Sequence, residues 1–187
     1  MLFRSAGAGR VNLANKEYDR AIEDFGRALG NAPHNADFLL GMGKAYEGIN
    51  QLTAAFDLYA EVARKAPKHP DVFGLMGRVL SLEQLHDQAI KVFKRGIELN
   101  PKNASLCYGL GRELRVMMQF NEAIEVFRKS VRNKDDEKQF YAAYKDIGDI
   151  YYYDLKNPEK AKDFYKKYMK FGGKDETVVS LVNSAKK

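Results

Sequence analysis

Cysteine, proline and histidine are scarce in this chain of 187 residues. The single cysteine, Cys107, has no partner for a disulfide within the chain, which excludes a disulfide-stapled fold and leaves the redox compartment open. Only five prolines are present, so helices are rarely interrupted. Because 45% of the residues are hydrophobic and 30% are charged, we expect a folded protein, and the scarcity of proline favours a mainly helical one.

Long hydrophobic runs are also absent from the sequence. No segment approaches the length of apolar sequence that spans a bilayer. Residues 1–16 contain no uninterrupted hydrophobic stretch like that of a signal peptide. We therefore expect this part of the protein to be soluble.

A glycine followed by a cation recurs at a fixed interval. The pairs are Gly9-Arg10, Gly43-Lys44, Gly77-Arg78 and Gly111-Arg112, each 34 residues after the previous one. They lack the residue spacing and the preceding strand of a phosphate-binding loop, which also has no reason to recur regularly. The interval indicates one structural unit copied along the chain.

Other positions keep the same register. Twelve residues after each glycine comes an alanine, four residues further comes an aromatic residue, and a proline closes each of the first three units. These residues are Ala21, Ala55, Ala89 and Ala123, then Phe25, Tyr59, Phe93 and Phe127, then Pro33, Pro67 and Pro101. Each unit has two apolar stripes with helical spacing, separated by a short polar break, which predicts a helical hairpin. The small residues allow the two helices to approach closely.

This pattern resembles the tetratricopeptide repeat family, whose signature combines L-G-x2-Y, A-x3-F and a proline. The resemblance implies an all-α fold, a right-handed α-solenoid of about five hairpins in a single domain over residues 1–187. The repeats are expected at 2–35, 36–69, 70–103, 104–137 and 141–174, followed by a capping helix at about 175–187. Within each hairpin we call the two helices the first and the second helix. Asn35 and Asn103 are suited to cap the first helices of the second and fourth hairpins.

The two ends of the predicted array depart from the pattern. Ser5 and Asn12 replace bulky residues, which leaves open whether the first repeat is complete and whether its edge stacks on a second copy in a homo-oligomer. The fifth repeat has one extra residue in its turn, and the longer junction at 133–139 precedes it.

Groups that would support catalysis or metal binding do not converge in this pattern. His34 and His69 fall at repeat junctions and His86 falls in a turn, which suits neither zinc ligation nor the activation of a nucleophile. The acidic residues form no recurrent pair. We therefore predict a protein that is not an enzyme, with no catalytic residue, cofactor or metal.

The resemblance implies that the first helices line a concave groove that holds a segment of another protein. The inward residues would be the recurring cations Arg10, Lys44, Arg78 and Arg112, joined by Arg115, Lys145, Tyr108 and Tyr152. An acidic segment would be attracted by several of these cations, and arginine forks onto carboxylates. We expect a scaffold or adaptor for an acidic partner segment, in the assembly of a larger complex.

Acids at the same positions offer a second interpretation, in which the cations are neutralised internally. The acids are Asp37, Glu47, Asp71, Asp146 and Asp149. In this interpretation Arg10 and Lys44 pair with the acids of the first repeats and Arg112 pairs with Asp149. Arg78 and Arg115 are then the freest cations, and the tyrosines serve as packing residues.

A chaperone C-terminal tail is not the expected partner. The family's carboxylate clamp needs lysine, asparagine and arginine at inward positions, where this chain has Ala6, Gly41 and Leu75. By analogy with family members in assembly and envelope machinery, the bacterial cytoplasm or cell envelope is the expected setting.

Most of the net charge of +6 lies near the end of the chain. Residues 155–174 hold seven lysines against Glu159 and Asp163, which gives 7 − 2 = +5. The lysines of residues 156–174 either form a solvated face or contact an acidic protein, anionic lipid or nucleic acid through loose charge attraction. Nucleic acid is the weaker expectation, and any membrane contact would be peripheral.

Overall fold

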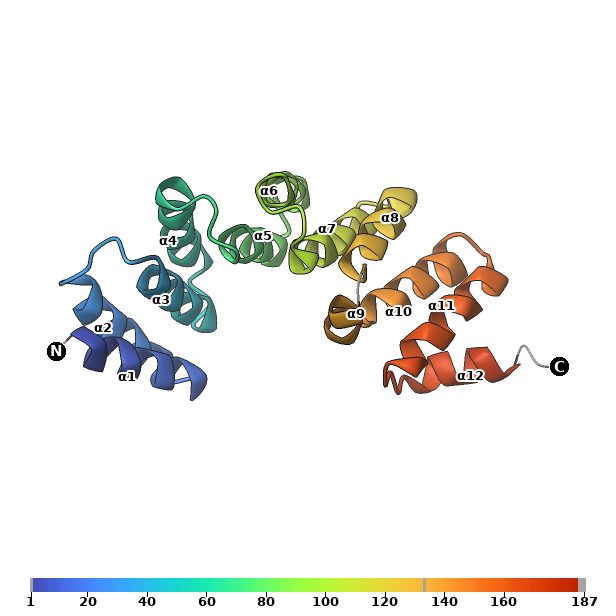
Figure 1. Cartoon of the computed structure of the whole chain (residues 1–187), viewed down its shortest axis with the longest axis horizontal. Coiled ribbons are helices and arrows are strands. Elements are labelled where there is room, and N and C mark those ends of the chain that lie inside the picture. Colours follow the sequence, from blue (N-terminus) through green and yellow to red (C-terminus); the bar gives the residue numbers. More distant parts are fainter. Residues whose placement is uncertain (1, 133, 185–187) are drawn as a thin grey trace. The chain divides into compact units, whose positions relative to one another are not determined.

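Helices make up the fold, and no strand occurs in residues 2–132 and 134–184, which are the residues that the computed structural model describes. The chain divides into two compact units, Met1–Gln88 and Ala89–Lys187. Figure 1 shows the helices in chain order. They are α1 (Leu2–Ala14), α2 (Tyr18–Leu29), α3 (Ala36–Gly48), α4 (Leu52–Lys65), α5 (Val72–Leu82), α6 (His86–Leu99), α7 (Ala104–Val116), α8 (Phe120–Ser130), α9 (Lys134–Phe140), α10 (Ala142–Asp149), the π-helical turn η1 (Ile150–Asp154), α11 (Pro158–Lys170) and α12 (Glu176–Ser184). The prediction of an all-α fold of helical hairpins is confirmed.

The first unit is a succession of helices in which each packs against the next, from α1 to α5. Helices α1 and α2 form a hairpin of two well-formed helices with 13 and 12 residues. The polar replacement at Asn12 strengthens this hairpin, because Asn12 Nδ2 donates a hydrogen bond of 2.8 Å to Asp24 Oδ2. The first repeat therefore forms a helical hairpin of α1 and α2.

The aromatic residue of each hairpin packs on glycines of first helices. In the first unit, a methyl group added to Gly9 would lie 3.2 Å from the Phe25 ring, and one added to Gly41 would lie 2.4 Å from Phe25 Cζ. Gly43 has the same relation to Tyr59, at 2.4 Å from Cε1. The Phe25 and Tyr59 side chains are almost fully buried, with 1% and 0% of their surface exposed. The recurring glycine is therefore a packing residue.

The second unit repeats this arrangement with other rings. A methyl group on Gly109 would lie 2.6 Å from Phe93, one on Gly111 2.7 Å from Phe127, and one on Gly148 2.4 Å from Tyr165. Gly111 precedes its ring by 16 residues and Gly148 by 17, so the fifth hairpin contains the extra residue.

The turns inside the hairpins share a backbone conformation that the sequence does not reveal. Lys16, Asn50, Gln84 and Met118 are 34 residues apart, and each has a positive φ between 58° and 62°. The amide of the next residue donates to a carbonyl oxygen five residues back, for example Gln51 to Tyr46 at 2.8 Å and Gln119 to Leu114 at 2.8 Å. This bond closes the C-terminal end of each first helix.

The fifth hairpin takes up its extra residue in η1. Helix α10 continues into this turn, in which the Leu155 amide donates to the Ile150 carbonyl oxygen at 2.9 Å. The left-handed residue is Lys156, with φ 52°, and the next amide, Asn157, donates six residues back to Tyr151 at 2.7 Å. A π-helical turn is a known way to insert one residue into a helix.

Helix ends follow the predicted caps at two places. The Asn35 side chain accepts a hydrogen bond from the Phe38 amide and the Asn103 side chain accepts one from the Leu106 amide, both at 3.2 Å. These contacts confirm the two predicted caps.

Two short helices complete the second unit. The junction expected at 133–139 contains α9, whose first turn carries Asp135, Asp136 and Glu137 and thereby suits the positive helix end. Helix α12 packs on α11, where Val178 and Val182 join Ala161 and Tyr165 in a buried cluster. The predicted capping helix is thus observed over 176–184, and residues 185–187 of the prediction lie outside the described residues.

Candidate functional site

The predicted cations of the first unit lie on first helices, with Arg10 on α1, Lys44 on α3 and Arg78 on α5. Both carboxylate oxygens of Glu47 on α3 lie 2.9 Å from Arg78 Nη2. The Tyr59 hydroxyl on α4 donates a hydrogen bond to the same carboxylate. Burial, and then the hydrogen bond to Glu47, raise the pKa of Tyr59, so its hydroxyl remains a donor at neutral pH. Glu47 therefore joins α3, α4 and α5.

The other two cations of this unit are less engaged. Arg10 Nη2 lies 4.0 Å from Asp37 Oδ2, and both side chains are mostly exposed, at 63% and 65%. Such a pair contributes little. His69 Nε2 lies 3.7 Å from the other Asp37 oxygen. Lys44 is half-buried and has no ion pair or hydrogen bond from its side chain within the described ranges 2–132 and 134–184.

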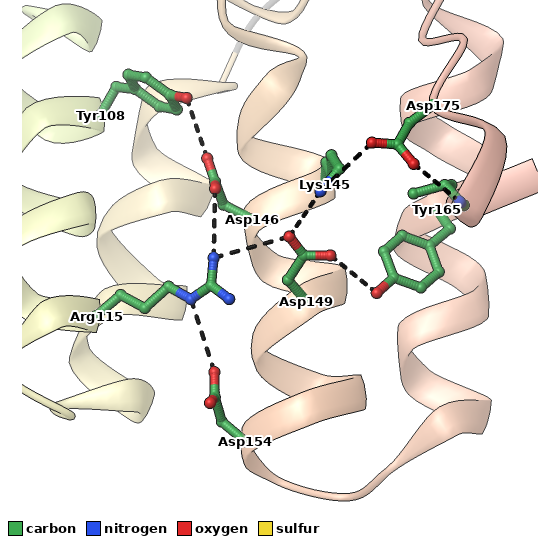
Figure 2. Close-up of polar contacts among 9 residues, drawn as sticks. Tyr108, Arg115, Lys145, Asp146, Asp149, Asp154, Tyr165 and Asp175 are labelled. Atoms are coloured by element: carbon green, nitrogen blue, oxygen red, sulfur yellow. Dashed lines mark hydrogen bonds and ion pairs between the residues drawn. The ribbon is translucent and has the colours of Figure 1, made fainter. Parts of the chain in front are cut away.

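In the second unit, Arg115 on α7 is surrounded by carboxylates (Figure 2). Its Nη1 atom lies 3.6 Å from Asp146 Oδ1 and 3.8 Å from Asp149 Oδ2, and its Nε atom lies 3.6 Å from Asp154 Oδ2. The Arg115 side chain is only 30% exposed, so salt screens these contacts less than it screens a surface pair. Arg115 thereby fixes α7 to α10 and η1.

Asp149 on α10 extends this network toward the end of the chain (Figure 2). It accepts hydrogen bonds from Lys145 Nζ at 2.9 Å and from the Tyr165 hydroxyl of α11 at 3.0 Å. Lys145 Nζ also lies 3.8 Å from Asp175, just before α12. Burial lowers the pKa of Lys145, but the hydrogen bond and charge of Asp149 outweigh this effect and raise it overall. Lys145 therefore remains a cation.

Tyr108 and Asp146 form the other branch of the network. The Tyr108 hydroxyl donates to Asp146 Oδ2 at 3.0 Å, and its ring lies 5.7 Å from the Phe127 ring. Burial raises the pKa of Asp146, although the Tyr108 hydrogen bond and Arg115 oppose the shift. Arg112, one turn along α7, is exposed, and its side chain forms no ion pair or hydrogen bond with any residue that the structure describes.

These contacts correct the predicted pairing. Arg78 and Arg115, predicted to be the freest cations, are each held by carboxylates. Lys44 and Arg112, predicted to be neutralised, have no carboxylate partner among the described residues. The physical reason is reach: Glu47 extends to Arg78 on α5, and Asp149 contacts Arg115 instead of Arg112.

Tyr152 lies in η1 and is half-buried. It packs against the buried cluster of Ala161, Tyr165, Val178 and Val182, and its ring centroid lies 4.8 Å from that of the more exposed Tyr153. Part of its surface is therefore already used in packing.

Sequence reasoning missed the hydroxyls of Tyr59 and Tyr165. Both occupy the position at which other repeats have Phe25, Phe93 or Phe127. A tyrosine at a core position brings a hydroxyl that needs a buried partner. An acid on the facing helix, Glu47 or Asp149, is that partner. The exchange of phenylalanine for tyrosine was the signal in the sequence.

The lysines of α11 are mostly exposed, as predicted from their spacing. They are not merely solvated, because Lys160, Lys167 and Lys170 lie over aromatic rings at 5.4 to 5.9 Å from the centroids. The buried stripe beneath them contains Ala161 and Tyr165.

Three further observations concern other kinds of site. The positions of a carboxylate clamp are buried here, with Ala6 4% exposed, Leu75 9% exposed and Gly41 against Phe25. In the part of the chain that the structure describes, no three His, Cys, Asp or Glu side chains are grouped to hold a metal ion. Over the same residues, none of the helices combines the length and the apolar character needed to cross a bilayer.

Alkaline pH is expected to destabilise the fold through its buried tyrosines. Burial raises the pKa of Tyr108 to about 12, above the value of roughly 10 in an unfolded chain. Between these values the folded phenol keeps a proton that the unfolded one has lost, so stability present below pH 10 declines as pH rises toward 12. The pKa values of Tyr59, Tyr144, Tyr165 and Tyr168 are also raised, first of all by burial.

Spectrophotometric titration of the phenols, with circular dichroism in parallel, tests this prediction. We expect a late group of tyrosines to ionise together with the loss of helical signal. In Tyr108→Phe the alkaline loss of stability should be less steep. Ionisation of all eleven tyrosines in one step with intact helices would contradict it.

Comparison with known sequences identifies the repeats. Sequence profiles described as tetratricopeptide repeat match residues 12–79 and 70–103. Small glutamine-rich tetratricopeptide repeat-containing protein 2 of Mycosarcoma maydis is 26% identical over 102 residues. This match covers 54% of the present chain and 29% of the relative, so the chain spans less than a third of that protein.

Solved structures share the fold. The crystal structure of MamA protein superimposes with a TM-score of 0.74 and 23% identity, covering 91% of each chain. YrrB, described as a TPR protein with an unusual peptide-binding site, gives a TM-score of 0.69 and 20% identity over 100% of this chain and 93% of its own. At these identities the likeness concerns the fold alone. It supports the predicted helical solenoid class.

Proposed function

Since the chain belongs to the tetratricopeptide-repeat family, we propose that it is a scaffold whose first helices bind an acidic segment of a partner protein. The repeats of this family serve in general as non-enzymatic scaffolds for protein–protein interaction. The finer proposal concerns the surface that does the binding and the charge of the segment. It would make the protein an adaptor in the assembly of a larger complex.

Two cations without internal carboxylate partners carry this proposal. Lys44 in the first unit and Arg112 in the second occupy the same repeat position, and neither forms an ion pair with a described residue. On the basis of the family resemblance, we expect this position on the groove side of the first helix. An unpaired cation on such a surface gains more from an incoming carboxylate than a paired one, because no internal bond must break.

The paired residues support the surface in a different way. Arg78, Arg115 and Tyr108 are each bound to a carboxylate of another helix, and Lys145 is bound to Asp149 of its own helix. We propose that they hold the first helices in position for binding, and that Arg10, with its weak pair to Asp37, adds a third accessible cation. Tyr152 would contribute the part of its ring that packing leaves exposed. A binding surface whose residues are already ordered loses less entropy when it binds.

The form of the partner is proposed by analogy. YrrB is described as having a peptide-binding site, and it has the same fold. An extended or helical peptide segment is therefore the occupant that we propose for each unit.

Selection from a phage-displayed peptide library tests the proposal. The wild-type protein should enrich peptides rich in Asp and Glu. Lys44→Glu and Arg112→Glu should each weaken the binding of an enriched peptide by about tenfold or more, the effect of losing one charge-assisted hydrogen bond. The matched charge reversals Lys68→Glu and Lys102→Glu, at exposed positions in the junctions between hairpins and not on the first helices themselves, should leave binding unchanged. Enrichment of neutral or basic peptides, or equal losses in all four variants, would reject an acidic partner on this surface.

A further inference from the structure

The second unit has a row of cations along α11 that continues onto α8. We define the cationic row as Arg128, Lys160, Lys167 and Lys170, all of them exposed. The three lysines are separated by seven and three residues, so they share one face of α11 over about 15 Å of its length. Arg128 on α8 adjoins them, because its Cζ atom lies 5.1 Å from the centroid of the Phe164 ring on α11.

Each cation of the row lies over an aromatic ring. Lys160 Nζ is 5.5 Å from the centroid of Tyr151, and Lys170 Nζ is 5.9 Å from that of Phe171. Lys167 Nζ lies 5.4 Å from the Tyr144 centroid and 5.7 Å from that of Phe164. A ring attracts a cation through its quadrupole but carries no net charge. The rings therefore position these cations and leave them unneutralised.

Among the described residues, no carboxylate neutralises these cations through an ion pair. In the part of the chain that the structure describes, none of the four side chains forms an ion pair. Asp163 shares the same face of α11, so four cations less one acid leave a charge of +3. This differs from Arg78, Arg115 and Lys145, which all face carboxylates. Like charges gathered without an internal counterion favour an anionic partner outside the chain.

The arrangement of the aromatic rings distinguishes between two possible anionic partners, a nucleic acid and a membrane surface. Tyr151 stacks on Phe164 with centroids 5.6 Å apart, and Tyr144 stacks on Phe171 at 6.0 Å. Tyr144 and Phe164 are also buried, at 5% and 8% exposure. The ring faces are thus occupied by cations and by one another, and are not open to the stacking of bases on which binding of single-stranded nucleic acid relies.

The cationic row has the properties that binding to a membrane surface requires. Attraction to an anionic leaflet needs several cations on one face, and it needs neither open rings nor forked contacts to base edges. Lysine offers a compact charge on a flexible stem that suits lipid phosphates. We propose that the cationic row binds the surface of membranes that contain anionic phospholipids. This peripheral attachment is separate from the binding of a peptide by the first helices.

Cosedimentation with vesicles tests this inference. The wild-type chain should bind vesicles of phosphatidylcholine mixed with phosphatidylserine, should not bind phosphatidylcholine alone, and should be released by salt. The triple variant Lys160→Gln, Lys167→Gln and Lys170→Gln should bind on the order of 100-fold more weakly, since each lysine near an anionic surface contributes roughly fivefold. Circular dichroism verifies that the variant remains helical.

A matched variant distinguishes an effect of the cationic row from an effect of the net charge of the protein. Lys68→Gln, Lys91→Gln and Lys102→Gln remove the same charge from exposed positions outside the row, and this variant should bind nearly as well as the wild type. Equal losses in both variants, or no binding by the wild type, would overturn the inference. Binding of poly(U) RNA in place of vesicles, with the same dependence on the row, would assign it to nucleic acid instead. The triple variant should still bind acidic peptides, so failure of this inference leaves the first-helix surface untouched.

Discussion

Replacing Gly43 by alanine is expected to lower the free energy of unfolding by about 2 kcal/mol. The added methyl group would lie 2.4 Å from Tyr59 Cε1, well inside van der Waals contact. The ring has no free space to move into, because Tyr59 is 0% exposed and its hydroxyl is bonded to Glu47. Overpacking of this kind costs up to about 3 kcal/mol, and the better helix propensity of alanine offsets about 1 kcal/mol.

The same substitution at Gly26 is the matched control. A methyl group on Gly26 would meet nothing within 4 Å, and Gly26 lies inside α2 of the same unit. Gly26→Ala should therefore stabilise the protein by up to about 1 kcal/mol. Urea denaturation followed by circular dichroism measures both variants. If Gly43→Ala proved as stable as Gly26→Ala, the close packing of glycine on the ring would be refuted.

Removal of the Asp149 carboxylate is expected to lower the free energy of unfolding by about 3 kcal/mol. The side chain is 11% exposed and contacts Lys145, Arg115 and the Tyr165 hydroxyl. In Asp149→Ala the Tyr165 hydroxyl would remain in a site that is 1% exposed, without its acceptor. Two cations would also lose a nearby opposite charge. A buried group that loses its partner costs more than the intact bond contributes.

Asp154→Ala is the control for this network. Asp154 also pairs with Arg115, at 3.6 Å, but its carboxylate is 27% exposed and bonds to no buried hydroxyl of a residue that the structure describes. Its removal should cost less than about 1 kcal/mol. Hydrogen exchange resolved along the chain should report a loss of protection in α10 and α11 for Asp149→Ala, with little change for Asp154→Ala. Similar effects of the two substitutions would show that burial does not distinguish them.

The hairpins could be predicted from the sequence because the residues that pack the helices together recur at a fixed interval. Gly43 and Tyr59 recur as a glycine and a ring in other repeats, and the caps at Asn35 and Asn103 use residue types that favour this place. The left-handed turns have no recurring residue type of this kind. Lys16, Asn50, Gln84 and Met118 have no shared chemistry and none is glycine, so their common conformation is imposed by the helices on either side.

The candidate site was harder to predict, for a physical reason. The repeat register correctly places Lys44, Arg78 and Arg112 on the first helices. It does not fix which neighbour a long side chain reaches, and a difference of three residues exchanges Arg112 for Arg115 as the partner of Asp149. The π-helical turn at 150–154 is equally hidden, because one extra residue in the sequence can be taken up in a loop or in a helix.

The Phe25 ring couples the first two hairpins, so that the loss of one destabilises the other. Phe25 rests on Gly9 of its own hairpin and on Gly41 of the following one. Unfolding of either α1 or α3 would expose one side of the Phe25 ring to water, so the loss of one hairpin lowers the stability of the adjacent one. Unfolding that begins at the outer end should therefore proceed in coupled steps, in which the loss of one hairpin lowers the stability of the next.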